Sequence, residues 1–271
     1  MIGQRILVLI PHPDDEAVGC AAAIEKARQQ GARVFSAYLT CGVPAPEMLW
    51  PWQRKSHIRR VLRRRQEANR AANALGLEIA SDQQIPTRTL RLALEGTHRL
   101  IQRLIRHLSI DMLWTPAYEG GHQDHDVTNF LASTFRSMLP LWEFSEYNFA
   151  GGRARSQEFF SPNGSEKTIL LTEEEQRRKR ATLGLYRSER ANLRHIWIEK
   201  EVFRPLAEYD YSQPPHSGKL FYQRFQWMPF HPQVDSTKPE AVCQAMREFR
   251  VMPESKLADQ RAGADDEGAE P

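Results

Sequence analysis

The sequence is poor in cysteine and has no long hydrophobic run. Its three cysteines, Cys20, Cys41 and Cys243, form no CxxC pair among 271 residues. This pattern excludes a disulfide framework and predicts a reducing, cytoplasmic location. The longest apolar run near the N-terminus, Ile6–Ile10, has five residues, which is too short for a signal-peptide core or a membrane span. We therefore expect a protein without a transmembrane segment.

Acidic residues are missing from residues 54–65, which contain seven bases and no acid. Residues 254–271 contain six acids and two bases, and almost no core-forming residue, so we expect a disordered acidic tail there. The simplest interpretation of the basic stretch is a solvated helix face. The alternatives are a site for a phosphate or carboxylate of a substrate, or docking on a membrane or nucleic acid. Nucleic acid is least favoured, because no nucleic-acid-binding motif accompanies the charges.

Strand and helix patterns alternate through the first half of the chain. Near-continuous apolar runs predict buried strands, whereas apolar residues at helical spacing predict helices. This alternation predicts an α/β fold with a doubly wound, mainly parallel sheet and helices on both faces. The predicted strands are Arg5–Ile10, Arg33–Leu39 and Ile110–Thr115, and the predicted helices cover residues 16–30, 54–76, 95–108 and 126–138.

The second half of the chain, after about residue 150, is less regular. Strands are predicted at Glu143–Asn148, Lys167–Leu171 and His195–Glu199, and the capping-box pattern of Thr172 and Glu175 predicts the start of a helix. No linker marks a domain boundary, so we expect a single domain over residues 1–253.

Two polar segments follow predicted parallel strands. Residues 11–16 read Pro-His-Pro-Asp-Asp-Glu, and residues 120–126 read Gly-Gly-His-Gln-Asp-His-Asp. Because parallel strands end at the same edge of a sheet, we expect both segments at one site. A helix start tolerates one or two acids as caps, and a cap is the ordinary role for Asp14 or Asp15. Three adjacent acids beside a histidine repel each other unless a cation balances them.

Imidazole and carboxylate together form a normal ligand set for a divalent metal such as zinc. A catalytic zinc has three protein ligands and an open position, and His12, Asp15 and His125 provide such a set. Asp14 adjoins a ligand and is placed to act as a base on a bound water. His122, one helical turn from His125, is expected to face the same cavity.

These segments resemble the hallmark motifs of the LmbE-like, or PIG-L-type, zinc-dependent deacetylases, which are (A/P)HPDDE after the first strand and HxDH later. Weaker similarities lie at residues 39–42, 64–67, 75–76 and 186–189. The resemblance implies a Rossmann-like fold and hydrolysis of an N-acetyl group, usually on a glucosamine-containing substrate. It also implies that His12, Asp15 and His125 bind Zn²⁺, with Fe²⁺ or another divalent metal as the alternative.

The resemblance further implies that Asp14 is the general base, that His122 stabilises the oxyanion or acts as an acid, and that Asp124 orients a histidine. We expect His122 to be protonated in that role. Some relatives have a tyrosine where this chain has Gly120, and Glu189 replaces a usual glutamine. These departures concern the identity of the substrate.

The candidate substrate-binding residues are Arg64, Arg65, Tyr118 and His216. We expect a small-molecule N-acetylated sugar as partner, and the sequence leaves a homo-oligomer open. A different amide conjugate, such as a thiol-sugar adduct or an antibiotic, is an alternative substrate. The alternative class is a metal-binding protein that docks on nucleic acid or membrane through its basic stretch. A pure binder has no need of Asp14, which favours an enzyme.

Overall fold

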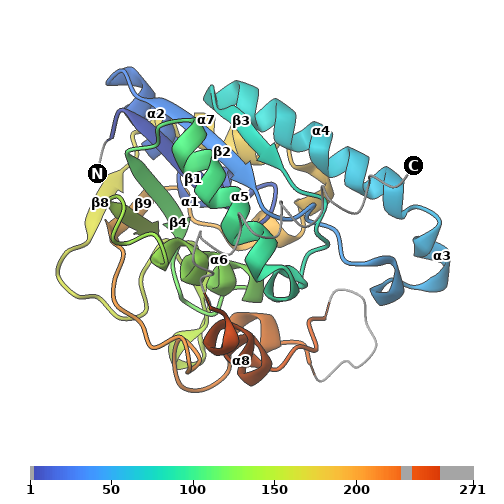
Figure 1. Ribbon diagram of the computed structural model, residues 1–271. Helices are drawn as coiled ribbons and strands as arrows, with labels where there is room; N and C mark the ends of the chain where they lie inside the picture. The colour runs from blue at the N-terminus through green and yellow to red at the C-terminus, as the bar shows by residue number, and fades with distance from the viewer. Residues whose placement is uncertain (1–2, 227–233, 251–271) are drawn as a thin grey trace, which may run out of the picture.

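A seven-stranded sheet forms the centre of the computed structural model, which describes residues 3–226 and 234–250 (Figure 1). The strand order is β3-β2-β1-β4-β5-β9-β8. The first five strands are parallel, and β9 runs antiparallel to both β5 and β8. The strands are β1 (Arg5–Ile10), β2 (Arg33–Tyr38), β3 (Glu78–Asp82), β4 (Met112–Pro116), β5 (Leu141–Phe144), β8 (Lys167–Leu170) and β9 (Lys200–Pro205), with a separate pair of β6 (Tyr147–Asn148) and β7 (Arg155–Ser156).

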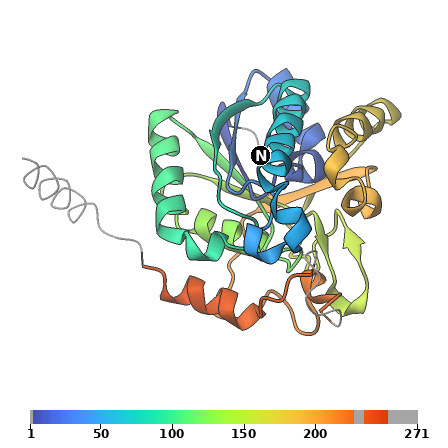
Figure 2. The same ribbon diagram turned by 90° about the vertical axis from the view of Figure 1, so that its right-hand side faces the viewer.

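Helices cover both faces of the sheet (Figures 1 and 2). The α-helices are α1 (Asp15–Gly19), α2 (Ala21–Gln29), α3 (Pro51–Arg54), α4 (His57–Leu75), α5 (Leu94–His107), α6 (Gln123–Ser133), α7 (Glu173–Leu183) and α8 (Pro239–Glu248). Short 3₁₀ helices are η1 (Pro46–Met48), η2 (Leu90–Leu92), η3 (Ala150–Gly152), η4 (Arg187–Glu189), η5 (Asn192–His195) and η6 (Phe221–Gln223).

The side chains of β1 alternate between two apolar cores. Ile6 and Val8 pack in a core with apolar residues of α2 and α4, whereas Leu7 and Leu9 pack in a core with those of α5, α6 and α8. This burial on both faces explains why β1 is an uninterrupted apolar run. The predicted doubly wound, mainly parallel sheet is therefore confirmed.

Several predicted boundaries are wrong. The helix expected over residues 16–30 is divided at Cys20, whose φ is −147°. The helix expected over residues 126–138 begins at Gln123 and ends at Ser133. No strand forms at His195–Glu199, since η5 ends there and β9 begins at Lys200. The sequence analysis also missed β3.

The sheet brings the two polar segments together. β1 and β4 are neighbours at the point where the strand order reverses, and ligands of doubly wound folds bind at this position outside the carboxyl ends of the strands. Residues 11–14 follow β1, and the segment after β4 leads into α6. Among the described residues, no helix has the length and apolar character needed to cross a membrane. The tail predicted at residues 254–271 lies outside the described residues.

Candidate metal and active site

The loop after β1 places Asp14 in a strained conformation. Its φ is +139°, which a side chain with a Cβ rarely adopts, and such strain is typical of functional sites. The Asp14 N–H donates to Glu16 Oε2 at 3.2 Å, and the Tyr186 hydroxyl donates to Glu16 Oε1. Buried Glu16 thereby holds the loop in place. The Asp14 side chain makes no capping hydrogen bond to α1, so the ordinary cap interpretation of Asp14 is wrong.

Three buried donor atoms form a nearly equilateral triangle at the ends of β1 and β4. His12 Nδ1 lies 3.3 Å from Asp15 Oδ2 and 3.2 Å from His125 Nε2, and the last two atoms are 3.3 Å apart. A tetrahedral zinc about 2.0–2.1 Å from each ligand requires ligands about 3.3–3.4 Å apart. His12, Asp15 and His125 therefore fit a divalent metal without rearrangement.

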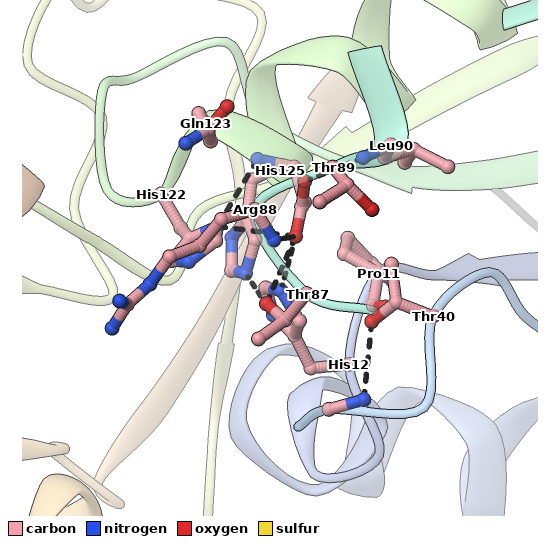
Figure 3. Close-up of polar contacts among 12 residues, drawn as sticks. Pro11, His12, Thr40, Thr87, Arg88, Thr89, Leu90, His122, Gln123 and His125 are labelled. Atoms are coloured by element: carbon pink, nitrogen blue, oxygen red, sulfur yellow. Dashed lines mark hydrogen bonds and ion pairs between the residues drawn. The ribbon is translucent and has the colours of Figure 1, made fainter. Parts of the chain in front are cut away.

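Asp124 contacts His12 from the side away from that triangle. Its Oδ2 lies 3.0 Å from His12 Nε2, and it also accepts hydrogen bonds from Thr87 Oγ1 at 2.9 Å and the Arg88 N–H at 2.6 Å (Figure 3). An ionised carboxylate on Nε2 leaves Nδ1 free for a metal, which is the usual outer arrangement of metal-binding histidines. The predicted contact of Asp124 with a histidine is thus observed, and the histidine is His12.

Thr87 and Arg88 were missed by the sequence analysis. They lie in the loop after β3, so they reach the same edge of the sheet as His12. A polar loop directly after a strand could have indicated these two residues. The strand itself was not predicted, because Glu78–Asp82 lacks the apolar run that identified β1.

Glu146 is a second residue that the sequence analysis missed. Its Oε2 lies 3.9 Å from His125 Nδ1, and neither carboxylate oxygen has a hydrogen-bond partner although the residue is fully buried. Burial, and then the charge of Asp15, raises the pKa of Glu146. Burial and Asp15 thus favour the protonated form of this carboxyl group, and a cation bound at the triangle would favour its ionised form instead. Glu146 lies just beyond the end of β5, at the same sheet edge as His12, and this position in the sequence could have indicated it.

The acids and imidazoles of the site shift each other's pKa values in opposite directions. Burial alone would lower the pKa of His12, but the charge of Asp15 and the hydrogen bond to Asp124 outweigh it and raise the pKa to about 10. Although burial opposes the change, the imidazoles of His125 and His12 lower the pKa of Asp15 far below its usual range. These opposite shifts describe a pocket that attracts a cation, whether a proton or a metal ion.

Arg64 is buried and holds Asp14 rather than presenting a free charge. Its Nη2 lies 3.3 Å from Asp14 Oδ1 and donates to the Pro13 carbonyl, while Nη1 lies 3.3 Å from Glu189 Oε1. Glu189, which stands where relatives have glutamine, therefore gives Arg64 a second anionic partner. Burial raises the pKa of Asp14, and the charge of Arg64 only partly offsets that effect.

His122 faces the cavity as a neutral imidazole. Its Nδ1 accepts the Asp124 N–H at 3.0 Å as the N-cap of α6, which leaves the ring proton on Nε2. Burial, together with the charge of His12, lowers the pKa of His122 well below its usual value. The expectation of a protonated His122 is therefore wrong. Figure 3 shows its ring gathered with those of His12 and His125, and the His12 and His122 centroids are 4.4 Å apart.

A cavity of about 870 Å³ opens over this cluster. The residues that line it include His12, Asp14, Asp15 and His122, and also Arg64, Thr87 and Arg88. His125 and Asp124 are almost completely buried and lie behind the cavity wall. The other walls come from the loop of η1 and α3, the N-terminal half of α4, η5 and η6. A sugar carrying a further group fits such a volume.

Three predicted substrate-binding residues lie elsewhere. Arg65 pairs through Nε with Asp82 Oδ2 at 2.8 Å. Tyr118 is buried, and its hydroxyl donates to the Gln213 carbonyl at 2.6 Å. His216 lies beside the Ser217 carbonyl, with Nδ1 and the oxygen 2.9 Å apart. None of the three lines the cavity, so the structure does not bring them together with His12 and Asp14.

Gly120 occupies a position where a side chain such as that of tyrosine would be strained. Its φ is +69°, and a Cβ there would lie 2.7 Å from Leu220 Cδ2. Tyr147, from β6, lines the cavity instead, with its ring centroid 5.6 Å from that of His125. The bare Gly121 allows this approach, because a Cβ on it would lie 2.5 Å from the Tyr147 carbonyl oxygen.

The sequence profile of the family described as PIG-L, GlcNAc-PI de-N-acetylase, matches residues 7–135. No protein with a curated description matches the sequence significantly. The fold resembles that of a deacetylase from the biosynthesis pathway of teicoplanin, at 19% identity and a TM-score of 0.58, over 74% of this chain and 97% of that one.

N,N'-diacetylchitobiose deacetylase from Pyrococcus horikoshii is similar at 18% identity and a TM-score of 0.56, over 78% of this chain and 84% of that one. 4-Carboxy-2-hydroxymuconate hydratase from Pseudomonas putida KT2440 is similar at 14% identity and a TM-score of 0.50, over 76% and 98% of the two chains. At these low identities, the structural similarity establishes a shared fold and nothing more. Because one of these structures is a hydratase, the fold leaves the reaction to be argued from the site.

Proposed function

Because the profile of the PIG-L family matches residues 7–135, we propose that the protein is a metal-dependent hydrolase. It removes the N-acetyl group from an N-acetylglucosamine-containing small molecule or glycoconjugate and releases acetate. The observation that carries the proposal is the triangle of His12 Nδ1, Asp15 Oδ2 and His125 Nε2, with Asp14 at the wall of the cavity above it.

We propose His12, Asp15 and His125 as the metal ligands and zinc as the metal, because two imidazoles and a carboxylate at this spacing suit Zn²⁺. Fe²⁺ accepts the same ligands and is the alternative. When bound, such a metal polarises a carbonyl and lowers the pKa of a water molecule.

Asp14 accepts the proton of the attacking water in this proposal. Its backbone strain, the hydrogen bond to Glu16 and the ion pair with Arg64 fix the carboxylate at the cavity wall. Burial raises its pKa, and a general base works best when its pKa lies near the operating pH. The proton then passes from Asp14 to the amine of the departing sugar.

His122 stabilises the negative charge that develops on the acetyl oxygen. Its Nδ1 is engaged by the Asp124 N–H, so Nε2 is the donor available to the substrate. A neutral donor held in a buried site stabilises an oxyanion without having to move. Since Nδ1 is occupied, we assign delivery of the proton to Asp14 and not to His122.

The cysteines are consistent with the proposed cytoplasmic location. Cys20, Cys41 and Cys243 are all buried and free. They carry no disulfide that an oxidising compartment would be needed to form.

Metal analysis combined with an acetate-release assay tests the function. We expect about one zinc or iron per chain and acetate release from a panel of N-acetylglucosamine compounds. The Asp14→Asn variant should bind metal equally well and release no acetate above background. Metal binding without acetate release from any N-acetylated sugar would overturn the proposal. Addition of water to an unsaturated acid, with no acetate formed, would instead favour a hydratase.

A further inference from the structure

The N-terminal half of α4 turns a row of arginines toward the cavity. Arg59, Arg60 and Arg63 line it, together with the buried Arg64. Their spacing of three and four residues places them on one face of the helix. Figure 1 shows this end of α4 beside α3, at the margin of the molecule. The basic stretch noted in the sequence is therefore divided between a cavity wall and an outer surface.

Apolar residues occupy the opposite face of the same half-helix. Ile58 is 75% exposed and Leu62 is 52% exposed, and neither lines the cavity. Arg59, Arg60 and Arg63 are exposed as well, so solvent reaches both faces of this half-helix, but only the arginine face borders the cavity. The three arginines are therefore open to a ligand that enters the cavity from solvent.

These three arginines have no anionic partner among the described residues. Arg60 Nε donates to Ser56 Oγ at 3.3 Å, and no ion pair is formed by Arg59, Arg60 or Arg63 within residues 3–226 and 234–250. Arg64 differs, since it is paired with Asp14 and Glu189.

The acids that line the cavity are engaged elsewhere. Asp14 and Glu189 pair with Arg64, and Asp15 lies against His12 and His125. Asp235 accepts hydrogen bonds from Gln123 and from the Thr237 N–H. Three like charges on one wall therefore remain without a counter-charge from the described part of the protein.

We infer that this wall is a binding site for an anionic group, a phosphoryl or a carboxylate, attached to the N-acetylated sugar or its aglycone. The inference rests on the proposed function. Guanidinium groups bind phosphate and carboxylate through paired, charge-assisted hydrogen bonds. The acetamide lies over His12 and Asp14 while the anion contacts Arg59, Arg60 and Arg63, because both sets of residues line one cavity.

The experiment compares kcat/KM for three substrates: N-acetylglucosamine 1-phosphate, N-acetylmuramic acid and the neutral methyl glycoside of N-acetylglucosamine. The test variant is Arg59→Gln/Arg60→Gln/Arg63→Gln. The matched control is Arg65→Gln/Arg70→Gln/Arg103→Gln, which removes the same charge from residues that do not line the cavity. The phosphate and carboxylate arms identify which anion the wall prefers.

We expect the wild-type protein to prefer an anionic substrate over the neutral one by about 10–100-fold, mostly through KM, because only the anionic group forms charge-assisted hydrogen bonds with the arginines. The preference should disappear in the test variant and persist in the control variant. It should also weaken with added salt. Equal use of neutral and anionic substrates by the wild type, or equal losses in both variants, would overturn the inference.

Direct binding separates this inference from the proposed function. If no N-acetyl compound releases acetate, calorimetry with inorganic phosphate on the metal-loaded protein still tests the wall. Phosphate binding that is lost in the test variant and kept in the control would support the site. Identical phosphate binding by both variants would reject it.

Discussion

Two buried polar networks of this protein differ in how their charges are paired. Beneath the antiparallel edge of the sheet, Lys179 Nζ donates to Glu201 Oε1 at 2.7 Å, and the N–H groups of Ala22 and Ala23 donate to the two Glu201 oxygens. The single carboxylate thus joins α7 and β9 to the first turn of α2. Each charge has a partner, and nothing is left over for a ligand.

The network at the ends of β1 and β4 is unbalanced. Asp14, Asp15, Asp124 and Glu146 surround His12 and His125, and the two Glu146 oxygens have no hydrogen-bond partner. Buried charges normally occur as satisfied pairs, because an unpaired one costs several kcal/mol. The difference teaches that paired charges stabilise this fold, whereas the acids that converge on His12 and His125 form its candidate cation site. The predictions below test that distinction, starting with the largest effect.

Removal of His125 should abolish the unbalanced site. We expect His125→Ala to lose the metal and to reduce acetate release to background, because two ligands are too few for a catalytic site. Metal content by elemental analysis and the acetate assay measure the effect. Circular dichroism should show a folded protein. A variant that retains one metal per chain would remove His125 from the ligand set.

Asp14 should matter for the reaction and not for the metal. Asp14→Asn keeps the size of the side chain and loses the base, so we expect kcat to fall by about 10²–10⁴-fold with unchanged metal content. Rates and metal analysis on the same preparation test this expectation. Near-normal kcat would show that another group accepts the proton.

Lys179 should matter for stability and not for the metal. Lys179→Ala leaves the Glu201 carboxylate buried without its cation, and we expect a loss of about 3–5 kcal/mol in the free energy of unfolding. Urea denaturation measures it. Metal content and kcat of the folded fraction should match the wild type. If Lys179→Ala lost metal and kept its stability, the two networks would not differ in the way described above.

Asp124 should have an intermediate effect as the outer partner of His12. We expect Asp124→Asn to weaken metal binding by about 10–100-fold, since the amide no longer provides the anionic acceptor that orients His12 Nε2. Competition with a chelator measures the affinity. Thr87→Val removes one neutral donor to the same carboxylate and should weaken the metal less. If Thr87→Val weakened metal binding more than Asp124→Asn, the loop after β3 and not Asp124 would be the element that orients His12.

The sequence predicted β1, β2 and β4 because strands buried on both faces are continuous apolar runs. It predicted the convergence of residues 11–16 and 120–126 because parallel strands share a carboxyl edge. It missed β3, where Glu78 and neighbouring residues are partly exposed at the edge of the sheet. Without β3, nothing in the sequence indicated that Thr87 and Arg88 reach Asp124.

Of the two adjacent arginines that the sequence offered as substrate-binding residues, only Arg64 lines the cavity. Arg64 and Arg65 are adjacent in sequence, yet a helix turns consecutive residues about 100° apart. As a result Arg64 is buried against Asp14 while Arg65 pairs with Asp82 on the outside. Composition could locate the basic stretch, but only the direction of α4 shows which of its arginines face the cavity.

The sequence by itself determined the layers of the fold and the residues that meet at the switch point of the sheet. These follow from local patterns: apolar runs, strand–helix alternation, and polar motifs directly after strands. Only the tertiary structure decided that Asp124 contacts His12, that His122 Nδ1 accepts the Asp124 N–H, and that Arg59, Arg60 and Arg63 share a wall with Asp14. These features depend on contacts between segments far apart in the chain and on the rotation of a helix about its axis, which no local pattern specifies.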